Sequence, residues 1–208
     1  MIFPPLKSEK GSRKEKTSKS GCPGIRNTGE TTKTKYEMEQ LDLKKQLLGV
    51  TALCAEYCHT LEVCRDLEPE EFVTAMLNLL PRLYRAFTDV NAEDEMLMPD
   101  EEEYFESYVD EDFYDSIRRN VESLLGPEDT FLETFEENMK YSDTPIAASI
   151  SESLADIFQP LFNFISIVKD TEGEKMAEAY KECRDNFQSY WAQTLCNVMR
   201  ALNFLKYK

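Results

Sequence analysis

Residues 141–168 read YSDTPIAASISESLADIFQPLFNFISIV, and apolar side chains recur in them every three or four positions. This spacing is typical of one buried face of an α-helix. We expect Thr144 or Asp143 to cap the helix and Pro145 to occupy its first turn. Pro160 should bend it, because proline removes one backbone donor. The apolar stripe consists of Ile146, Ile150, Leu154, Ile157, Leu161, Phe164 and Val168.

The same spacing extends over most of residues 38–208, and alternation of period two is nearly absent. Glycine is rare in this part of the chain, and Gly126 is followed by Pro127, which should end a helix. The pattern predicts an all-α fold, a compact bundle of about six helices in one domain over 38–208, with a further kink at Pro81. The other helices are expected at about 38–66, from Pro69 onward, and at about 111–125, 128–140 and 173–206.

The helical pattern fails over residues 89–112, which hold twelve acidic residues and no Lys or Arg. We expect a long acidic loop here. One interpretation is a docking segment for a basic protein, in which aromatic residues anchor the partner and acids steer its approach. The other is a solvated loop whose aromatic residues fold back on the body. The aromatic residues concerned are Tyr104, Phe105, Tyr108, Phe113 and Tyr114.

Residues 1–37 differ sharply in charge from the rest. They contain nine Lys or Arg and four Glu, a net charge of +5, so the formal charge of −16 leaves −21 on residues 38–208. The segment has few periodic apolar residues and is expected to be a disordered basic tail. Two alternatives are that translation starts at Met38, or that the tail is a basic arm that binds an acidic surface, even the body itself.

The charge of residues 38–208 bears on function. An acidic surface repels phosphate backbones and anionic membranes, so nucleic acid and membranes are not expected partners, whereas a basic protein or a cation is. No secretory signal is visible in residues 1–16, and the longest apolar stretch, residues 157–168, is interrupted by polar residues and Pro160 and is too short to span a bilayer. We therefore expect a cytoplasmic protein with reduced thiols.

The stretch LCAEYCHTLEVC, residues 53–64, holds three of the six cysteines and the single histidine. On a helix that turns about 100° per residue, Cys54 and Cys58 share the apolar face, and His59 lies about 140° away from Cys54. Cys64 faces another direction, so one metal ion could not collect all four side chains. Cys183 and Cys196 are about three and a half turns apart. We expect the cysteines to pack as small apolar groups and predict no metal site.

Catalytic motifs that depend on histidine or on glycine-rich phosphate loops are absent from the sequence. Any enzymatic chemistry would have to use carboxylates, tyrosines or arginines. Glu152 and Asp156, four residues apart, and Asp185 are possible acid–base or metal-binding groups, but a solvated helix face explains them as well. No catalytic, cofactor-binding or metal residue is assigned, no cofactor is expected, and the protein is more consistent with a non-enzyme.

Three stretches resemble a bacterial family known as domain of unknown function 5063, which is typical of Bacteroides-like organisms. They are YSDTPIAASISESLADIFQPLFNFI (141–165), CRDNFQSYWAQTLCNVMRAL (183–202) and AEYCHTLE (55–62). The resemblance covers about residues 40–207 and implies an all-helical, cytoplasmic, single-domain protein with no established activity. It also suggests a pocket where Tyr141–Pro145 meets Tyr190 and Trp191, although helix capping and core packing explain these residues equally well.

Two functional hypotheses follow. The first is a non-enzymatic interaction or adaptor protein that uses the acidic region 89–112; changing Glu101, Glu102 and Glu103 to Lys should then abolish partner binding without unfolding the protein. The second is a small-ligand-binding module, or a carboxylate-based enzyme, with a pocket between helices, which predicts a cavity with convergent polar groups. A third idea, mimicry of nucleic acid, requires carboxylates at phosphate-like spacing.

Overall fold

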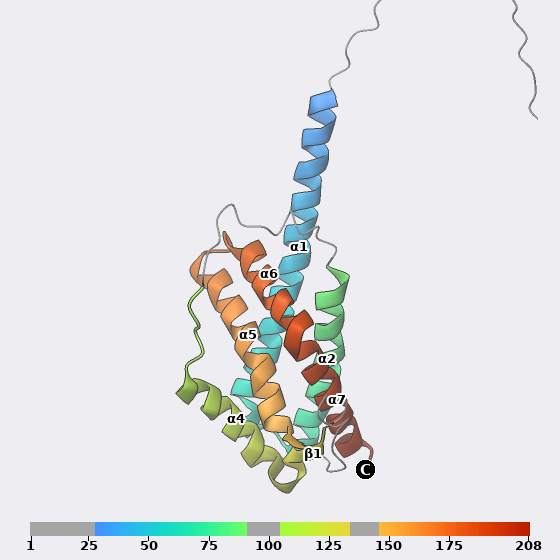
Figure 1. Ribbon diagram of the computed structural model, residues 1–208, viewed down its shortest axis with the longest axis vertical. Coiled ribbons are helices and arrows are strands. Elements are labelled where there is room, and N and C mark those ends of the chain that lie inside the picture. The colour runs from blue at the N-terminus through green and yellow to red at the C-terminus, as the bar shows by residue number, and fades with distance from the viewer. Residues whose placement is uncertain (1–27, 91–104, 134–145) are drawn as a thin grey trace, which may run out of the picture.

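The computed structural model describes residues 28–90, 105–133 and 146–208, with side chains from residue 37 onward. Within these ranges the protein is a bundle of helices with one very small sheet, so the predicted all-α class is confirmed. Figure 1 labels the main elements. In chain order they are α1 (Thr28–Glu62), the 3-10 turn η1 (Cys64–Asp66), α2 (Pro69–Asp89), α4 (Glu111–Leu125), the 3-10 turn η2 (Gly126–Asp129), β1 (Thr130–Leu132), β2 (Ala147–Ser149), α5 (Ile150–Asp170), α6 (Met176–Asn186), the π-helical turn η4 (Phe187–Trp191) and α7 (Ala192–Lys206).

The helices α1, α2 and α5 and the continuous rod α6–η4–α7 lie side by side, and α4 crosses the lower end of the bundle against α5 (Figure 1). The N-terminal part of α1 extends beyond the other helices (Figure 1). None of the described helices contains a stretch long and apolar enough to cross a membrane.

The core is rich in aromatic residues. Phe87 of α2 packs against Tyr180, Phe187 and Trp191, with ring centroids 5.5, 5.4 and 4.9 Å away. This cluster joins α2 to the rod α6–η4–α7. A second cluster, in which Phe113 of α4 meets Phe158 and Phe162 at 5.5 and 5.1 Å, fixes α4 on α5. Edge-to-face contacts of this kind add to the hydrophobic stabilisation of the core.

The first helix differs from the prediction at both ends. It begins at Thr28, ten residues before the predicted helix start at Met38. Residues 1–27 of the predicted tail lie outside the described residues. Once a helix is nucleated, each added residue gains one backbone hydrogen bond, which lets α1 continue past its packed part. It ends at Glu62, and the predicted last turn is the separate 3-10 turn η1.

The predicted helix at 128–140 is wrong where the structure describes it. Gly126, with φ of +53°, ends α4, and β1 follows η2 and pairs antiparallel with β2, Phe131 opposite Ala148. Residues 134–140 lie outside the described part of the chain. Three-residue strands are too short to show alternation in a sequence, so the apolar spacing of Phe131 and Phe135 resembled a helix face.

The fifth helix starts later than predicted. Ala147–Ser149 form β2, and α5 begins at Ile150 with Ser149 as its cap, whose side chain accepts a hydrogen bond from the Glu152 N–H. The predicted caps Asp143 and Thr144 and the predicted first-turn Pro145 lie outside the described residues. Both α2 and α5 continue through their internal prolines, Pro81 and Pro160. The predicted sixth helix is α6 and α7 joined by the π-helical turn η4.

Candidate ligand-binding site

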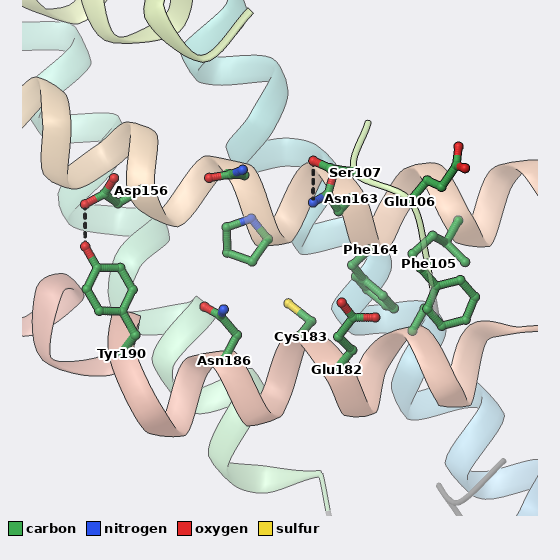
Figure 2. Close-up of a pocket in the computed structure, with 14 residues that line it drawn as sticks. Phe105, Glu106, Ser107, Asp156, Asn163, Phe164, Glu182, Cys183, Asn186 and Tyr190 are labelled. Atoms are coloured by element: carbon green, nitrogen blue, oxygen red, sulfur yellow. Dashed lines mark hydrogen bonds between the residues drawn. The ribbon is translucent and has the colours of Figure 1, made fainter. Parts of the chain in front are cut away.

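A cleft of about 300 Å³ opens between α5 and α6, and residues 105–107 form one of its walls (Figure 2). The turn Thr171–Lys175 is short, so the two helices run antiparallel and face each other along the cleft. Gly173, with φ of +83°, makes this tight reversal possible. The lining residues are Phe105, Glu106, Ser107, Asp156, Gln159, Pro160, Asn163, Phe164, Ile167, Ala179, Glu182, Cys183, Asn186 and Tyr190.

The wall at residues 105–107 is held in place by hydrogen bonds from the next residues to α5. The backbone N–H of Tyr108 donates to Asn163 Oδ1 at 2.8 Å, and the Tyr108 hydroxyl donates to Asp170 at 2.8 Å. Asn163 Nδ2 also donates to Ser107 Oγ at 3.4 Å, and Val109 is buried. The described end of the acidic loop therefore folds back on the body. The predicted loop over residues 91–104, including Tyr104, lies outside the described residues.

One end of the cleft is a carboxylate held by two tyrosines. Tyr114 donates to Asp156 Oδ1 at 2.7 Å, and Tyr190 donates to Oδ2 at 2.6 Å (the latter in Figure 2). Burial, followed by the bond to Asp156, raises the pKa of both tyrosines above the ordinary value, so both hydroxyls stay protonated donors. Each carboxylate oxygen has a second lone pair, so Asp156 can still accept a hydrogen bond from a ligand in the cleft.

The other end of the cleft is lined by Glu182 and Glu106, beside Phe105 (Figure 2). Burial raises the pKa of Glu182, because desolvation disfavours the charged carboxylate. A positively charged ligand would offset that cost. Between the two ends lies Cys183, whose thiol pKa is raised well above its ordinary value by burial and, to a lesser degree, by the neighbouring Cys58.

The charge of the cleft is uniform. Among the residues that the structure describes, its lining contains three carboxylates and no Lys, Arg or His. The nearby Lys181 forms an ion pair with Asp185 at 2.7 Å, and Asp185 is exposed and does not line the cleft. The cleft therefore favours cations over anions.

The structure brings together some of the residues singled out in the sequence and separates others. Asp156 and Tyr190 meet in the cleft, whereas Glu152 and Asp185 lie outside its lining. Trp191, the neighbour of Tyr190, is fully buried against Phe87. The segment Tyr141–Pro145 lies outside the described residues, so the suggested meeting of the two regions is untested.

The cysteine–histidine stretch at residues 53–64 has the arrangement expected of a packed helix. Cys54 and Cys58 are buried in the core, where Cys183 of α6 is their neighbour, and His59 is exposed. Cys64 is also buried, in the 3-10 turn η1. Among the residues that the structure describes, no three His, Cys, Asp or Glu side chains lie close enough together to hold a metal ion.

Several residues of the cleft were missed in the sequence. Gln159, Asn163 and Asn186 are amides beside the apolar stripes of α5 and α6, and Glu182 is one acid among many. The available signal was the run Asp156, Gln159, Asn163 along α5, polar residues that recur every three or four positions. Such a run usually marks a solvated face.

Comparison with known proteins places the chain by fold and sequence. The family described as "Domain of unknown function (DUF5063)" matches residues 42–208. The crystal structure of protein BF1032 from Bacteroides fragilis matches with a TM-score of 0.68 and 32% sequence identity, covering 79% of this chain and 94% of that chain. No curated protein matches the sequence significantly.

Proposed function

The chain belongs to the family described as Domain of unknown function (DUF5063), and we propose that it is a non-enzymatic binding protein whose α5–α6 cleft receives a small, positively charged ligand. The resemblance noted in the sequence is thus confirmed for the family, and the family description names no activity. The function therefore has to be argued from the cleft.

The observation that carries the proposal is the chemistry of the lining. A cleft of about 300 Å³ combines three carboxylates and three amides with Phe105, Phe164 and Ile167, and none of its described lining residues is cationic. Ligand sites in proteins are concave and largely apolar, with a few polar groups that fix the orientation of the ligand. This cleft has that composition at the lower end of the usual size range.

Catalysis is less well supported than binding. Both oxygens of Asp156 accept hydrogen bonds from tyrosines, and the Cys183 thiol is buried with a raised pKa. A cysteine nucleophile needs an activating base or a lowered pKa, whereas the pKa of Cys183 is raised by burial. We also propose a cytoplasmic location, supported by the free state of the five described cysteines.

The acidic region 89–112 remains a second candidate, as a contact for a basic protein partner. Its described aromatic residues favour the interpretation that they fold back on the body, because Tyr108 is bound to Asn163 and Asp170. Reversal of Glu101, Glu102 and Glu103 to Lys tests the partner hypothesis, with thermal unfolding of the variant as the check that the fold is intact. Loss of a partner on that reversal would support it.

The test of the binding proposal is thermal unfolding of the full chain with a panel of small organic cations, each paired with a neutral molecule of similar shape. A cation that binds only the folded state raises the Tm in a concentration-dependent way. Asp156→Asn should abolish the rise, and Asp185→Asn, an exposed acid on the same rod, should leave it unchanged. Equal responses to cations and neutral molecules, or a full response in Asp156→Asn, would contradict the proposal.

A further inference from the structure

The carboxylates of the cleft are divided between its two ends. Asp156 lies with Tyr190 at one end, and Glu182 and Glu106 lie near Phe105 at the other (Figure 2). On the rod α6–η4–α7, Glu182 precedes Tyr190 by eight positions, which corresponds to about 12 Å along a helix. One small cation cannot contact both ends at once.

The middle of the cleft differs from its ends. Pro160 and Phe164 of α5 line the cleft together with Cys183 of α6, and Figure 2 shows Cys183 between Tyr190 and Glu182 along the rod. Pro160 carries no backbone N–H to offer a polar ligand, and Phe164 presents an apolar ring. This part of the cleft suits methylene groups.

Amide side chains lie beside the apolar middle. Asn186 lies between Cys183 and Tyr190 along the rod (Figure 2). Gln159 directly precedes Pro160 on α5 and also lines the cleft. An amide has a carbonyl oxygen that accepts hydrogen bonds and an NH₂ group that donates them. These amides can therefore accept hydrogen bonds from an amine nitrogen between the two ends.

We infer that the cleft binds a linear aliphatic diamine or polyamine, with one ammonium group at Asp156, the other at Glu182, and the methylene chain along Pro160, Phe164 and Cys183. This inference rests on the proposed function and names the class of ligand. Each ammonium group has three donors and no acceptor, and each end of the cleft supplies carboxylate oxygens. A compact monocation would use only one end.

The experiment is calorimetric titration of the full chain with amines of graded length, near physiological ionic strength so that weak surface binding is screened. The ligands are 1,3-diaminopropane, putrescine, cadaverine, 1,6-diaminohexane, spermidine and spermine. Butylamine and hexylamine are the matched monoamines. We expect one site per chain, an optimum at one ligand length, and binding of the best diamine at least about tenfold tighter than that of its monoamine, a difference well outside the error of a Kd.

Three variants locate the two ammonium groups. Glu182→Gln should reduce the affinity for the best diamine to the affinity for its monoamine. The affinity for the monoamine itself should change little. Asp156→Asn should weaken both, and Asp185→Asn should affect neither. Circular dichroism of each variant shows whether the helical fold is retained.

The outcomes separate the inference from the proposed function. If monoamines and diamines bind equally well and both depend on Asp156, the cleft binds cations and the diamine inference is wrong. If Glu182→Gln leaves diamine affinity unchanged, the inference is also wrong. If no amine binds, or if binding occurs at many weak sites that do not depend on Asp156, the diamine inference and amine binding in the cleft are both wrong, and the panel of other cations then decides the proposed function.

Discussion

Tyr114 and Tyr190 show how two hydroxyl groups can hold one carboxylate between three elements. Tyr114 comes from α4, Asp156 from α5 and Tyr190 from the turn η4, and the two bonds measure 2.7 and 2.6 Å. A hydrogen bond to an ionised acceptor is shorter and stronger than one between neutral groups. The same pair of bonds that fixes Asp156 in the cleft therefore also ties α4 and η4 to α5.

The cysteines give a prediction about reactivity. Cys54, Cys58 and Cys183 are buried, and burial raises the pKa of each thiol well above its ordinary value. The thiolate is the reactive form of cysteine. These residues should therefore react slowly with an alkylating reagent, because the reagent cannot reach them easily and because little of each thiol is ionised. Cys196 is exposed. We expect iodoacetamide near neutral pH to alkylate Cys196 long before the three buried thiols.

Peptide mapping by mass spectrometry over a time course measures this order of alkylation. The control is the same reaction in concentrated denaturant, where all the cysteines should be modified at similar rates. Fast modification of Cys54 or Cys58 in the native protein would show that the interface between α1 and α6 opens readily, contrary to its packing in the structure.

At the scale of elements, the start of α5 is fixed by an acid that no sequence pattern indicated. Asp129 at the end of η2 is 6% exposed and accepts hydrogen bonds from the backbone N–H and the hydroxyl of Ser151, at 2.8 and 2.7 Å. A carboxylate near the first turn of a helix also interacts favourably with the helix dipole. Asp129 thus connects the turn after α4 to the helix that forms one side of the cleft.

Replacement of Asp129 by Ala should lower the free energy of unfolding by about 1–3 kcal/mol, because it leaves the Ser151 donors without their acceptor in a buried place. Glu128→Ala is the matched control. Glu128 is half exposed and pairs with Lys208 at 2.9 Å, an exposed pair expected to contribute about 0–1 kcal/mol. Urea denaturation followed by circular dichroism compares the two variants. Equal losses would mean that the Asp129–Ser151 bonds contribute no more than a surface ion pair.

The sequence was sufficient to predict the long helices but not the short strands. Apolar residues at three-to-four spacing identified α2, α4 and most of α5, because each buries one face over several turns. The same spacing placed a helix at residues 128–140, where Phe131 belongs to β1. It also started the fifth helix at Pro145, although Ala147–Ser149 form β2. Three-residue strands depend on pairing with a distant partner, which a local pattern cannot contain.

At the scale of the whole molecule, the candidate site depends on contacts between distant segments, which local sequence patterns do not predict. Its lining comes from residues 105–107, 156–167 and 179–190, which meet only after α5 and α6 pack against each other. Asp156 and Tyr190 were each noted in the sequence, but Asp156 was paired with Glu152 and Tyr190 with Trp191. In the structure Tyr190 donates a hydrogen bond to Asp156, 34 positions away. Tertiary packing, rather than helical periodicity, determines that contact.

The net charge of the chain leads to a prediction about salt. Residues 38–208 carry a formal charge of −21, so like charges repel one another across the folded surface and destabilise the compact state. Salt screens this repulsion, since the Debye length falls from about 30 Å at 0.01 M to about 8 Å at 0.15 M. Salt also weakens ion pairs between helices, such as Glu56–Arg82 at 3.1 Å and Glu70–Lys206 at 3.0 Å.

Whether salt raises or lowers the Tm depends on the balance between the screened repulsion and the weakened ion pairs. Exposed ion pairs contribute about 0–1 kcal/mol each, whereas the repulsion involves the excess charge of the whole body. We therefore expect sodium chloride to raise the Tm by a few degrees over this range, since 1 kcal/mol corresponds to about 2–4 °C for a chain of this length. Thermal unfolding at several salt concentrations measures the change, with sucrose in place of salt as an uncharged control. A Tm that falls with salt would show that the ion pairs between helices outweigh the repulsion among the acids.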